Sequence, residues 1–345
     1  GHEAPRSYIP AIPFPTSSVG SFPQNKEIRQ ARVQVKKNEI SLASYHEIIK
    51  RHTKQWMDFQ NELAVDIPVD GEFLREDMAV YFSAAFGGKL LDFVPSYENL
   101  RYRPVEFFSA IRHPKSPITT HEFLYAQSLT KQPLKATLTG PATLADWALL
   151  SHKKYYFDRR ALRRDLAEAL RNEIGHLLDA GACIIQIDEP ALTTKMKYFD
   201  MDCEAIYETM REYDEQAYFI LHICYSDMKA LDGAFPSMLA LPFHQIHMEM
   251  ANRNYALLSL IEKYGFAEKD IGLGVIDVHT DRIESVDEIV EGIGRVRNYF
   301  PPEKIWLTPD CGLKERSDAV ARVKLQTLSV AAKICRMKLE EYARP

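Results

Sequence analysis

The sequence is poor in the features that mark several common protein classes. Its five cysteines are few for 345 residues, and their wide spacing argues against a disulfide framework and favours a reducing compartment. The net charge is −5 and no basic block is present, so nucleic acid is not an expected partner. No apolar run approaches the ~20 residues that a membrane span needs. We therefore expect a cytoplasmic protein, with no membrane partner, that acts on small molecules.

The N-terminal residues also lack the pattern of a targeting segment. The stretch "GHEAPRSYIPAIPFP" has no positively charged segment followed by an apolar run, and it does not begin with Met. We interpret residues 1–14 as an N-terminal extension or a cloning remnant. Residues 15–342 are then expected to form a single domain.

Eight short apolar or β-branched runs are present, and segments with helical periodicity separate most of them. The runs are 16–21, 64–71, 135–141, 183–190, 218–226, 243–250, 271–279 and 304–312. In the segment 159–181, leucine and isoleucine form one apolar stripe and Gly181 is placed to end the helix. Alternation of strand and helix predicts an α/β fold of the (β/α)8 TIM-barrel type. The alternative, an open doubly wound sheet, would need a Gly-rich phosphate fingerprint after the first strand, and none is found there.

Polar residues stand where a barrel requires them. The active site of such a fold is built at the C-terminal ends of the strands. The polar residues that end the runs are Ser21, Asp70, Glu72, Asp188, Glu189, His222, Cys224, Glu249, Asp277, His279, Asp310 and Cys311. Helix N-caps would explain Ser21, Asp188 or Asp310 equally well. They would not explain Cys224, Glu249 or Cys311.

One connection is much longer than the others. Residues 71–134 form an insertion after the second run, with a predicted helix at "HEFLYAQSLTKQ" (121–132). Loops of this length in a compact domain are usually functional. We expect the insertion to wall the pocket at the barrel mouth.

A metal site is predicted from four residues on three of the strands. His222 and Cys224 are two apart in "LHICYSD" and so share one face of a strand, although a histidine and a cysteine in such a run are also common as buried core residues. Glu249 and Cys311 end two other strands at the same mouth. One nitrogen, two sulfurs and a carboxylate oxygen suit four-coordinate Zn²⁺. A structural zinc site would more often use close Cys pairs, so this set favours a catalytic site with one exchangeable position.

The collinear motifs resemble the catalytic half of cobalamin-independent methionine synthase, in the short core form without the N-terminal half. They are "TSSVGSFPQNKEIR" (16–29), "DGEFLREDMAVYF" (70–82), "LTGPATLADW" (138–147), "IIQIDEPAL" (184–192), "HICYSD" (222–227), "DVH" (277–279) and "TPDCGLKER" (308–316). The resemblance implies a (β/α)8 fold and methyl transfer from methyltetrahydrofolate to homocysteine. It also implies a zinc held by His222, Cys224, Glu249 and Cys311. After Glu249, however, "MANRN" departs from the usual Asn-Ser-Arg-Ser of the family.

The same resemblance assigns roles on the substrate side. Ser21, Glu72 and Asp188 match the positions that bind homocysteine, the two carboxylates around its amino group and the Ser21 region at its carboxylate. The alternative to this role is that Asp188 and Glu189 form an N-cap pair after the fourth strand. Trp147 matches the aromatic residue that packs on the pterin of the folate, although a tryptophan in that position is also a routine core residue.

His279 and Asp277 match the proton-relay pair of the family, with a hydrogen-bonded loop histidine as the alternative. An amine anion is a very poor leaving group, so the donor nitrogen must gain a proton as the methyl group leaves. His279, tuned by Asp277, is the residue suited to supply it.

The identity of the methyl donor stays open at this point. The insertion reads "NLRYRPVEFF" (99–108) where the longer family members have a Lys-Pro-Pro-containing pattern. A methylcorrinoid such as methylcobalamin, delivered by a partner protein, is therefore an alternative donor. A non-catalytic zinc-binding barrel is the alternative from another class, but storage of zinc would not need Glu72, Asp188 and His279.

Overall fold

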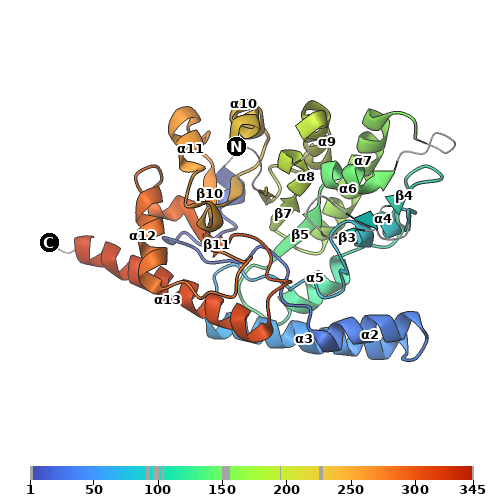
Figure 1. The fold of residues 1–345 in the computed structure, drawn as a ribbon, viewed down its shortest axis with the longest axis horizontal. Helices are drawn as coiled ribbons and strands as arrows, with labels where there is room; N and C mark the ends of the chain where they lie inside the picture. The colour runs from blue at the N-terminus through green and yellow to red at the C-terminus, as the bar shows by residue number, and fades with distance from the viewer. Residues whose placement is uncertain are drawn as a thin grey trace.

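A parallel sheet forms the centre of this computed structural model, which describes residues 3–90, 94–95, 101–102, 105–149, 156–194, 196–224 and 228–343. Six parallel strands lie in the order β11, β10, β9, β8, β7, β5. Their bounds are β5 Lys135–Thr139, β7 Ile184–Asp188, β8 Tyr218–His222, β9 Gln245–Glu249, β10 Asp270–Ile276 and β11 Ile305–Pro309. In Figure 1 they occupy the middle of the molecule, with helices around them.

Two short N-terminal runs close this sheet into a ring. The amide of Ser17 donates to the carbonyl of Leu307 in β11 at 3.1 Å, and a parallel bridge joins Ser17 to Ile67. On the other side, the amide of Lys135 in β5 donates to the carbonyl of Pro68 at 3.0 Å. The eight runs of the sequence thus lie side by side in one closed ring. The predicted (β/α)8 barrel is confirmed.

The first two runs differ from the regular strands expected at 16–21 and 64–71. They are joined to their neighbours by isolated bridges, and Pro68 in the second run has no amide hydrogen to donate. The side chain of Gln60 takes the place of a neighbouring strand at Val69. Its Oε1 accepts from the Val69 amide at 3.0 Å, and its Nε2 donates to the Val69 carbonyl at 2.8 Å.

Helices cover the outside of the ring (Figure 1). The longer ones are α2 Lys26–Lys36, α3 Leu42–Glu62, α7 Arg159–Asp179, α9 Phe199–Met210, α10 Met228–Leu239, α12 Val286–Val296 and α13 Asp318–Ala343. The shorter ones are α1 Glu3–Arg6, α4 Val80–Ala85, α5 Thr120–Gln127, α6 Pro141–Trp147, α8 Pro190–Thr194 and α11 Leu258–Tyr264, with 3-10 turns η1 Met196–Tyr198, η2 Ala251–Arg253 and η3 Pro302–Lys304. Among the described residues, no helix has both the length and the apolar character to cross a membrane.

Helix α7 confirms the helix predicted over 159–181. The stripe residues are all buried against the barrel: Leu162, Leu166, Leu170, Ile174 and Leu177. The helix ends at Asp179, and Gly181 follows with φ of +98°, a left-handed conformation that favours glycine.

The insertion after the second run contains α4, α5 and short strands at its base. These strands are β1 Lys89–Leu90, β2 Val94–Pro95, β3 Arg101–Tyr102 and β4 Val105–Glu106, and β4 pairs with β6 Ala148–Leu149. The helix predicted at 121–132 is present but ends at Gln127, whose side chain accepts from the Leu134 amide and donates to the Gln132 carbonyl. Much of "NLRYRPVEFF", on which the donor alternatives depend, lies outside the described residues.

The N-terminal segment packs on the barrel. Arg6 forms a salt bridge of 2.7 Å with Asp270, the first residue of β10. Phe14 is buried in the main core, and its amide donates to the carbonyl of Pro302. The division between an extension of residues 1–14 and a barrel of residues 15–342 stays a prediction.

Helices α7 and α9 offer a stability test with an internal control. The Arg163–Asp202 salt bridge (2.6 Å) is buried, with side-chain exposures of 5% and 3%. The Arg160–Glu204 pair joins the same helices at exposures of 43% and 52%. Arg163→Ala leaves a buried carboxylate unpaired and should lower the free energy of unfolding by ~3–5 kcal/mol. Arg160→Ala should lower it by less than ~1 kcal/mol. Urea denaturation of both variants measures the difference, and equal losses would contradict this account.

Candidate metal centre and substrate pocket

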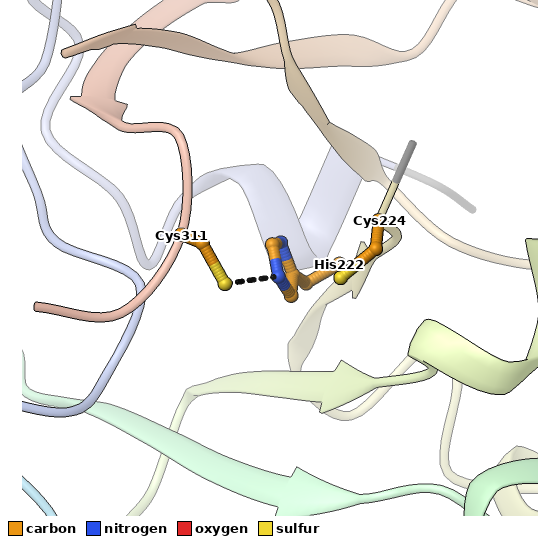
Figure 2. A group of neighbouring side chains, drawn as sticks. All are labelled: His222, Cys224 and Cys311. Carbon is orange, nitrogen blue, oxygen red and sulfur yellow. Dashed lines mark hydrogen bonds between the residues drawn. The ribbon is translucent and has the colours of Figure 1, made fainter. Parts of the chain in front are cut away.

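Three of the predicted metal ligands meet at the barrel mouth. His222 ends β8, Cys224 lies two residues later, and Cys311 lies two residues after β11. Their ligand atoms all lie within 4.8 Å of one another, and the Cys311 sulfur is 3.6 Å from His222 Nε2. Figure 2 shows the side chains converging from β8 and from the segment that follows β11.

The backbone around each thiol is held in place. The hydroxyl of Thr193, in α8, donates to the Cys224 carbonyl at 2.6 Å. Beyond Cys311, the amide of Leu313 donates to the carbonyl of Ser21 at 2.9 Å. The two sulfurs are thus positioned by different parts of the rim, Cys224 by α8 and Cys311 by the segment that carries Ser21.

The cluster favours a thiolate at Cys311. Hydrogen bonds from the Cys224 thiol and from His222 hold the pKa of Cys311 well below its usual value, against the opposing effect of burial. The same hydrogen bond to Cys311, together with burial, raises the pKa of Cys224. Burial alone would lower the pKa of His222, but Cys311, Asp188 and Glu249 raise it. The negative charge of this cluster is therefore concentrated on one sulfur, close to the imidazole.

Glu249, the predicted fourth ligand, lies outside this group of three. It ends β9 and is buried, and its Oε1 is 4.0 Å from Nε2 of His279. His279 itself is 65% exposed at its side chain, on the segment after β10. The Asp277 carboxylate accepts from the backbone amide of His279 at 2.9 Å, so it shapes this loop. The roles of Glu249 as a ligand and of His279 with Asp277 as a proton relay stay predictions.

Asp310 fixes the segment that follows Glu249. Its two carboxylate oxygens accept from three consecutive amides, those of Met250, Ala251 and Asn252, at 2.9–3.1 Å. Burial raises the pKa of Asp310 to about 8, although these hydrogen bonds oppose the shift. Asp310, the residue before Cys311, therefore binds the segment that follows β9. An N-cap of the next helix would instead bind amides that follow Asp310 in the chain.

Two predicted substrate-binding carboxylates lie at the same mouth, Asp188 buried and Glu72 with 12% of its side chain exposed. The Glu72 carboxylate lies 3.1 Å from Arg75, and its backbone has φ of +58°. A Cβ on Gly20 would lie 1.9 Å from Glu72 Oε2, so only glycine leaves room for this carboxylate. Asp188 ends β7 and accepts from Gln186 at 2.8 Å, and burial raises its pKa to about 7.

Glu189 is structural, in contrast to its neighbour Asp188. Its two oxygens accept from the amides of Ala142 and Thr143 at 2.9 Å, in the first turn of α6. It therefore caps α6, a helix that precedes it in the chain, whereas the sequence suggested an N-cap of the following helix. Burial raises the pKa of Glu189 to about 8.

Ser21 and Trp147 occupy different positions around the mouth. Ser21 is bridged to Gly71 and its hydroxyl would be 2.0 Å from a Cβ on Gly312, next to Cys311. Trp147 ends α6, is half-buried and packs against the main core. The structure thus places Ser21 beside the cluster of His222, Cys224 and Cys311. Trp147 contacts the core, as a routine core residue would, but part of its side chain is exposed.

The insertion lines a cavity of about 350 Å³ beside Glu72. Tyr81 of α4 and His121 and Tyr125 of α5 face it, and so do residues of α3. The cavity reaches Asp70 and Glu72, but its lining does not include His222, Cys224 or Cys311. That the insertion walls the pocket at the metal cluster stays a prediction.

His247, which the sequence analysis did not select, contacts the cluster directly. It lies in β9 beside His222 in β8, and their Nδ1 atoms are 2.7 Å apart. Alternation along a strand would have pointed to it, because His247 and Glu249 are two residues apart and share a face. Its contact with His222 depends on the register of β8 and β9, which the sequence does not give.

The donor set fits a zinc ion. One imidazole nitrogen and two sulfurs within 4.8 Å of one another are the borderline-soft donors that zinc prefers, and one sulfur is already favoured as thiolate. Glu249, which ends β9, stays the predicted fourth ligand. Fold and site together define a class: a (β/α)8 barrel with a Cys–His cluster at its carboxyl-terminal mouth that could hold a metal ion.

Comparison with known proteins identifies the family within this class. Residues 14–334 match the family described as "Cobalamin-independent synthase, Catalytic domain". A methionine synthase of Saccharolobus solfataricus is 35% identical over 329 residues, which cover 95% of this chain and 96% of that protein. The chain therefore belongs to the cobalamin-independent methionine synthase family.

Longer relatives and solved structures agree with this assignment. The 5-methyltetrahydropteroyltriglutamate–homocysteine methyltransferase of Bacillus licheniformis is 34% identical over 95% of this chain, which spans only 43% of that relative. A B12-independent methionine synthase from Shewanella sp. W3-18-1, solved with selenomethionine, shares the fold with a TM-score of 0.80 at 23% identity, over 95% of this chain and 99% of that one. A second such structure, from Listeria monocytogenes, has a TM-score of 0.75 at 21% identity, over 94% and 99%.

Proposed function

We propose that this protein transfers a methyl group from a methylated tetrahydrofolate to the thiolate of homocysteine, with a zinc ion held by His222, Cys224, Cys311 and Glu249. The observation that carries the proposal is the convergence of one imidazole and two thiols within 4.8 Å at the mouth of a barrel of this family. Relatives named for the folate and for homocysteine, at 34–35% identity, support this choice of substrates.

The chemistry divides between the metal and the side chains around it. When bound, zinc supplies a Lewis acid that keeps a substrate thiol deprotonated near neutral pH. Asp188 and Glu72 bind and orient the substrate ammonium, because the buried Asp188 and the largely buried Glu72 lie at the same mouth and Gly20 leaves space for Glu72. The region of Ser21 receives the substrate carboxylate.

Transfer needs a proton on the donor side. The bond between the methyl carbon and the folate nitrogen breaks, the bond between that carbon and the homocysteine sulfur forms, and the nitrogen gains a proton. His279 donates this proton from its imidazole, since its exposed position on the loop after β10 faces the mouth at Glu249. Trp147, half-buried at the end of α6, packs against the pterin ring.

The proposal is tested by a methionine-formation assay with homocysteine, using methyltetrahydrofolate and methylcobalamin in parallel. Formation of methionine from the folate supports it. Formation from methylcobalamin alone would assign the methyl donor to a corrinoid, and zinc binding without methionine from either donor would favour a zinc-binding barrel.

Cys224→Ser should lower zinc occupancy sharply, because a hydroxyl that stays protonated is a much weaker zinc ligand than a thiolate. Elemental analysis of protein purified without chelator gives the zinc occupancy. In the wild-type protein it should be close to one zinc per chain. Cys203→Ser is the matched control, since Cys203 lies in α9 outside the cluster. Full zinc in Cys224→Ser would show that Cys224 is not a ligand.

Asp188→Asn should raise the KM for homocysteine by ~10-fold or more with zinc content unchanged, because it removes a buried charge opposite the substrate ammonium. The carboxylate form of Asp188 is lost as the pH falls through its pKa of about 7, so the wild-type KM should rise below that pH and the variant's should not. Glu189→Gln is the contrast: it should lower stability through α6 and leave KM unchanged. Loss of zinc in Asp188→Asn would contradict the assignment.

His279→Asn separates transfer from binding. It should keep zinc and homocysteine affinity but reduce turnover with methyltetrahydrofolate by ~10²–10⁴-fold, the range expected for loss of a general acid. Transfer from methylcobalamin, whose leaving group needs no proton, should change much less. Equal losses with both donors would mean that His279 positions the substrate, and an unimpaired variant would exclude it as the acid.

A further inference from the structure

A pair of buried histidines joins the metal cluster to the barrel interior. His222 and His247 are 3% and 1% exposed, and their ring centroids are 4.7 Å apart at an interplanar angle of 51°. Their Nδ1 atoms approach to 2.7 Å, a hydrogen-bond distance. One of these two nitrogens must therefore donate and the other must accept.

The other side of His247 determines which nitrogen donates. His247 Nε2 lies 3.1 Å from the carbonyl oxygen of Pro309, which can only accept. It also lies 2.5 Å from Thr308 Oγ1, whose own hydroxyl donates to the carbonyl of Leu273 at 3.3 Å. The Pro309 carbonyl thus requires a proton on His247 Nε2, and a Thr308 hydroxyl that donates to Leu273 is free to accept from the same nitrogen.

The remaining proton follows from the charge of His247. The ring of His247 is 1% exposed, and the groups within hydrogen-bond distance of it are the His222 ring, the Thr308 hydroxyl and the Pro309 carbonyl, none of them a carboxylate. A buried imidazolium without a carboxylate partner is costly, so the ring is neutral and carries one proton. That proton is on Nε2, which leaves a lone pair on Nδ1. Nδ1 of His222 must then be the donor in the contact between the rings.

We propose that His247 is a positioning residue for the metal centre: by accepting a hydrogen bond from His222 Nδ1, it keeps a proton on Nδ1 and orients Nε2, the nitrogen 3.6 Å from the Cys311 sulfur, toward the metal site. This inference rests on the proposed zinc site, because its purpose is to present Nε2 as a metal ligand. Partners that accept from the second nitrogen of a ligating histidine commonly set its orientation and raise its basicity. Here the partner is a second imidazole.

The same contacts also tie together the strands that carry the ligands. His247 is in β9, two residues before Glu249, and it donates to Pro309, two residues before Cys311 in the chain. Through His222 it also contacts the end of β8. One side chain therefore links the segments that contribute all the predicted ligands.

The tautomer is measured first in the wild-type protein, without any substitution. Long-range ¹H–¹⁵N NMR of protein labelled at histidine should show His222 protonated at Nδ1 and His247 protonated at Nε2, with His247 neutral at pH 7. This pattern is expected in metal-free protein as well as with zinc added. A His222 that lacks the Nδ1 proton, or a His247 protonated at Nδ1, would overturn the proposal.

Variants then test the effect on the metal. His247→Leu removes the acceptor for His222 and should raise the zinc dissociation constant by ~10–100-fold, measured by competition with a chromogenic chelator. In His247→Gln the amide oxygen can accept from His222 Nδ1 while the amide nitrogen donates to Pro309, so it should recover most of the affinity. His244→Leu is the matched control, because His244 is also buried and accepts from the amide of Phe219, three residues before His222.

Two results would count against the positioning role. Wild-type zinc affinity in His247→Leu would overturn it, and so would equal losses in His247→Leu and His244→Leu, which would indicate a general effect of core damage. Thermal unfolding of each variant is recorded alongside, and the wild-type NMR pattern decides the matter if a variant does not fold. If the wild-type protein binds no zinc, the proposed function is wrong. The NMR measurement still tests the hydrogen bond from His222 to His247 in that case.

Discussion

The closed parallel sheet is the constraint on which the site depends. Parallel strands in a ring end on the same side, so residues distant in the chain meet at one rim without any local motif bringing them together. His222 at the end of β8 and Cys311 after β11 are 89 positions apart and still lie 3.6 Å from each other. Away from the rim, the side chain of Gln60 supports the interrupted segment of the ring at Val69. Hydrogen bonds formed at a distance from the cluster therefore contribute to the ring that positions it.

Several acidic groups of this rim are buried, and their pKa values are raised as a result. Burial raises the pKa of Asp188 to about 7, and those of Glu189 and Asp310 to about 8. Glu189 and Asp310 are stabilised by backbone amides and support structure, whereas Asp188 shares its surroundings with His222 and Lys135. A rim with this balance favours cationic ligands, and both a metal ion and a substrate ammonium meet that condition.

The sequence was sufficient where a property depends on local spacing or on the order of elements. Strand–helix alternation predicted the barrel, and residues at strand ends predicted the His222, Cys224 and Cys311 cluster. The sequence could not predict contacts that depend on strand register or on partners far away in the chain. The amides that Glu189 caps are 46 and 47 positions earlier in the chain. The pairing of His222 with His247 requires knowing which residues of β8 and β9 lie side by side. The insertion was recognised by its length alone.

The three hydrogen bonds of Asp310 have a mechanical consequence. They attach the segment directly after Glu249 to the residue directly before Cys311, so these two parts of the rim are expected to move as one rigid body. Cys224 is held separately, through Thr193 on α8. Any opening of the centre would then be a hinge between α8 on one side and the joined ends of β9 and β11 on the other. A movement of the segment after Glu249 would then be expected to shift Cys311 as well, and to change its distance from Cys224.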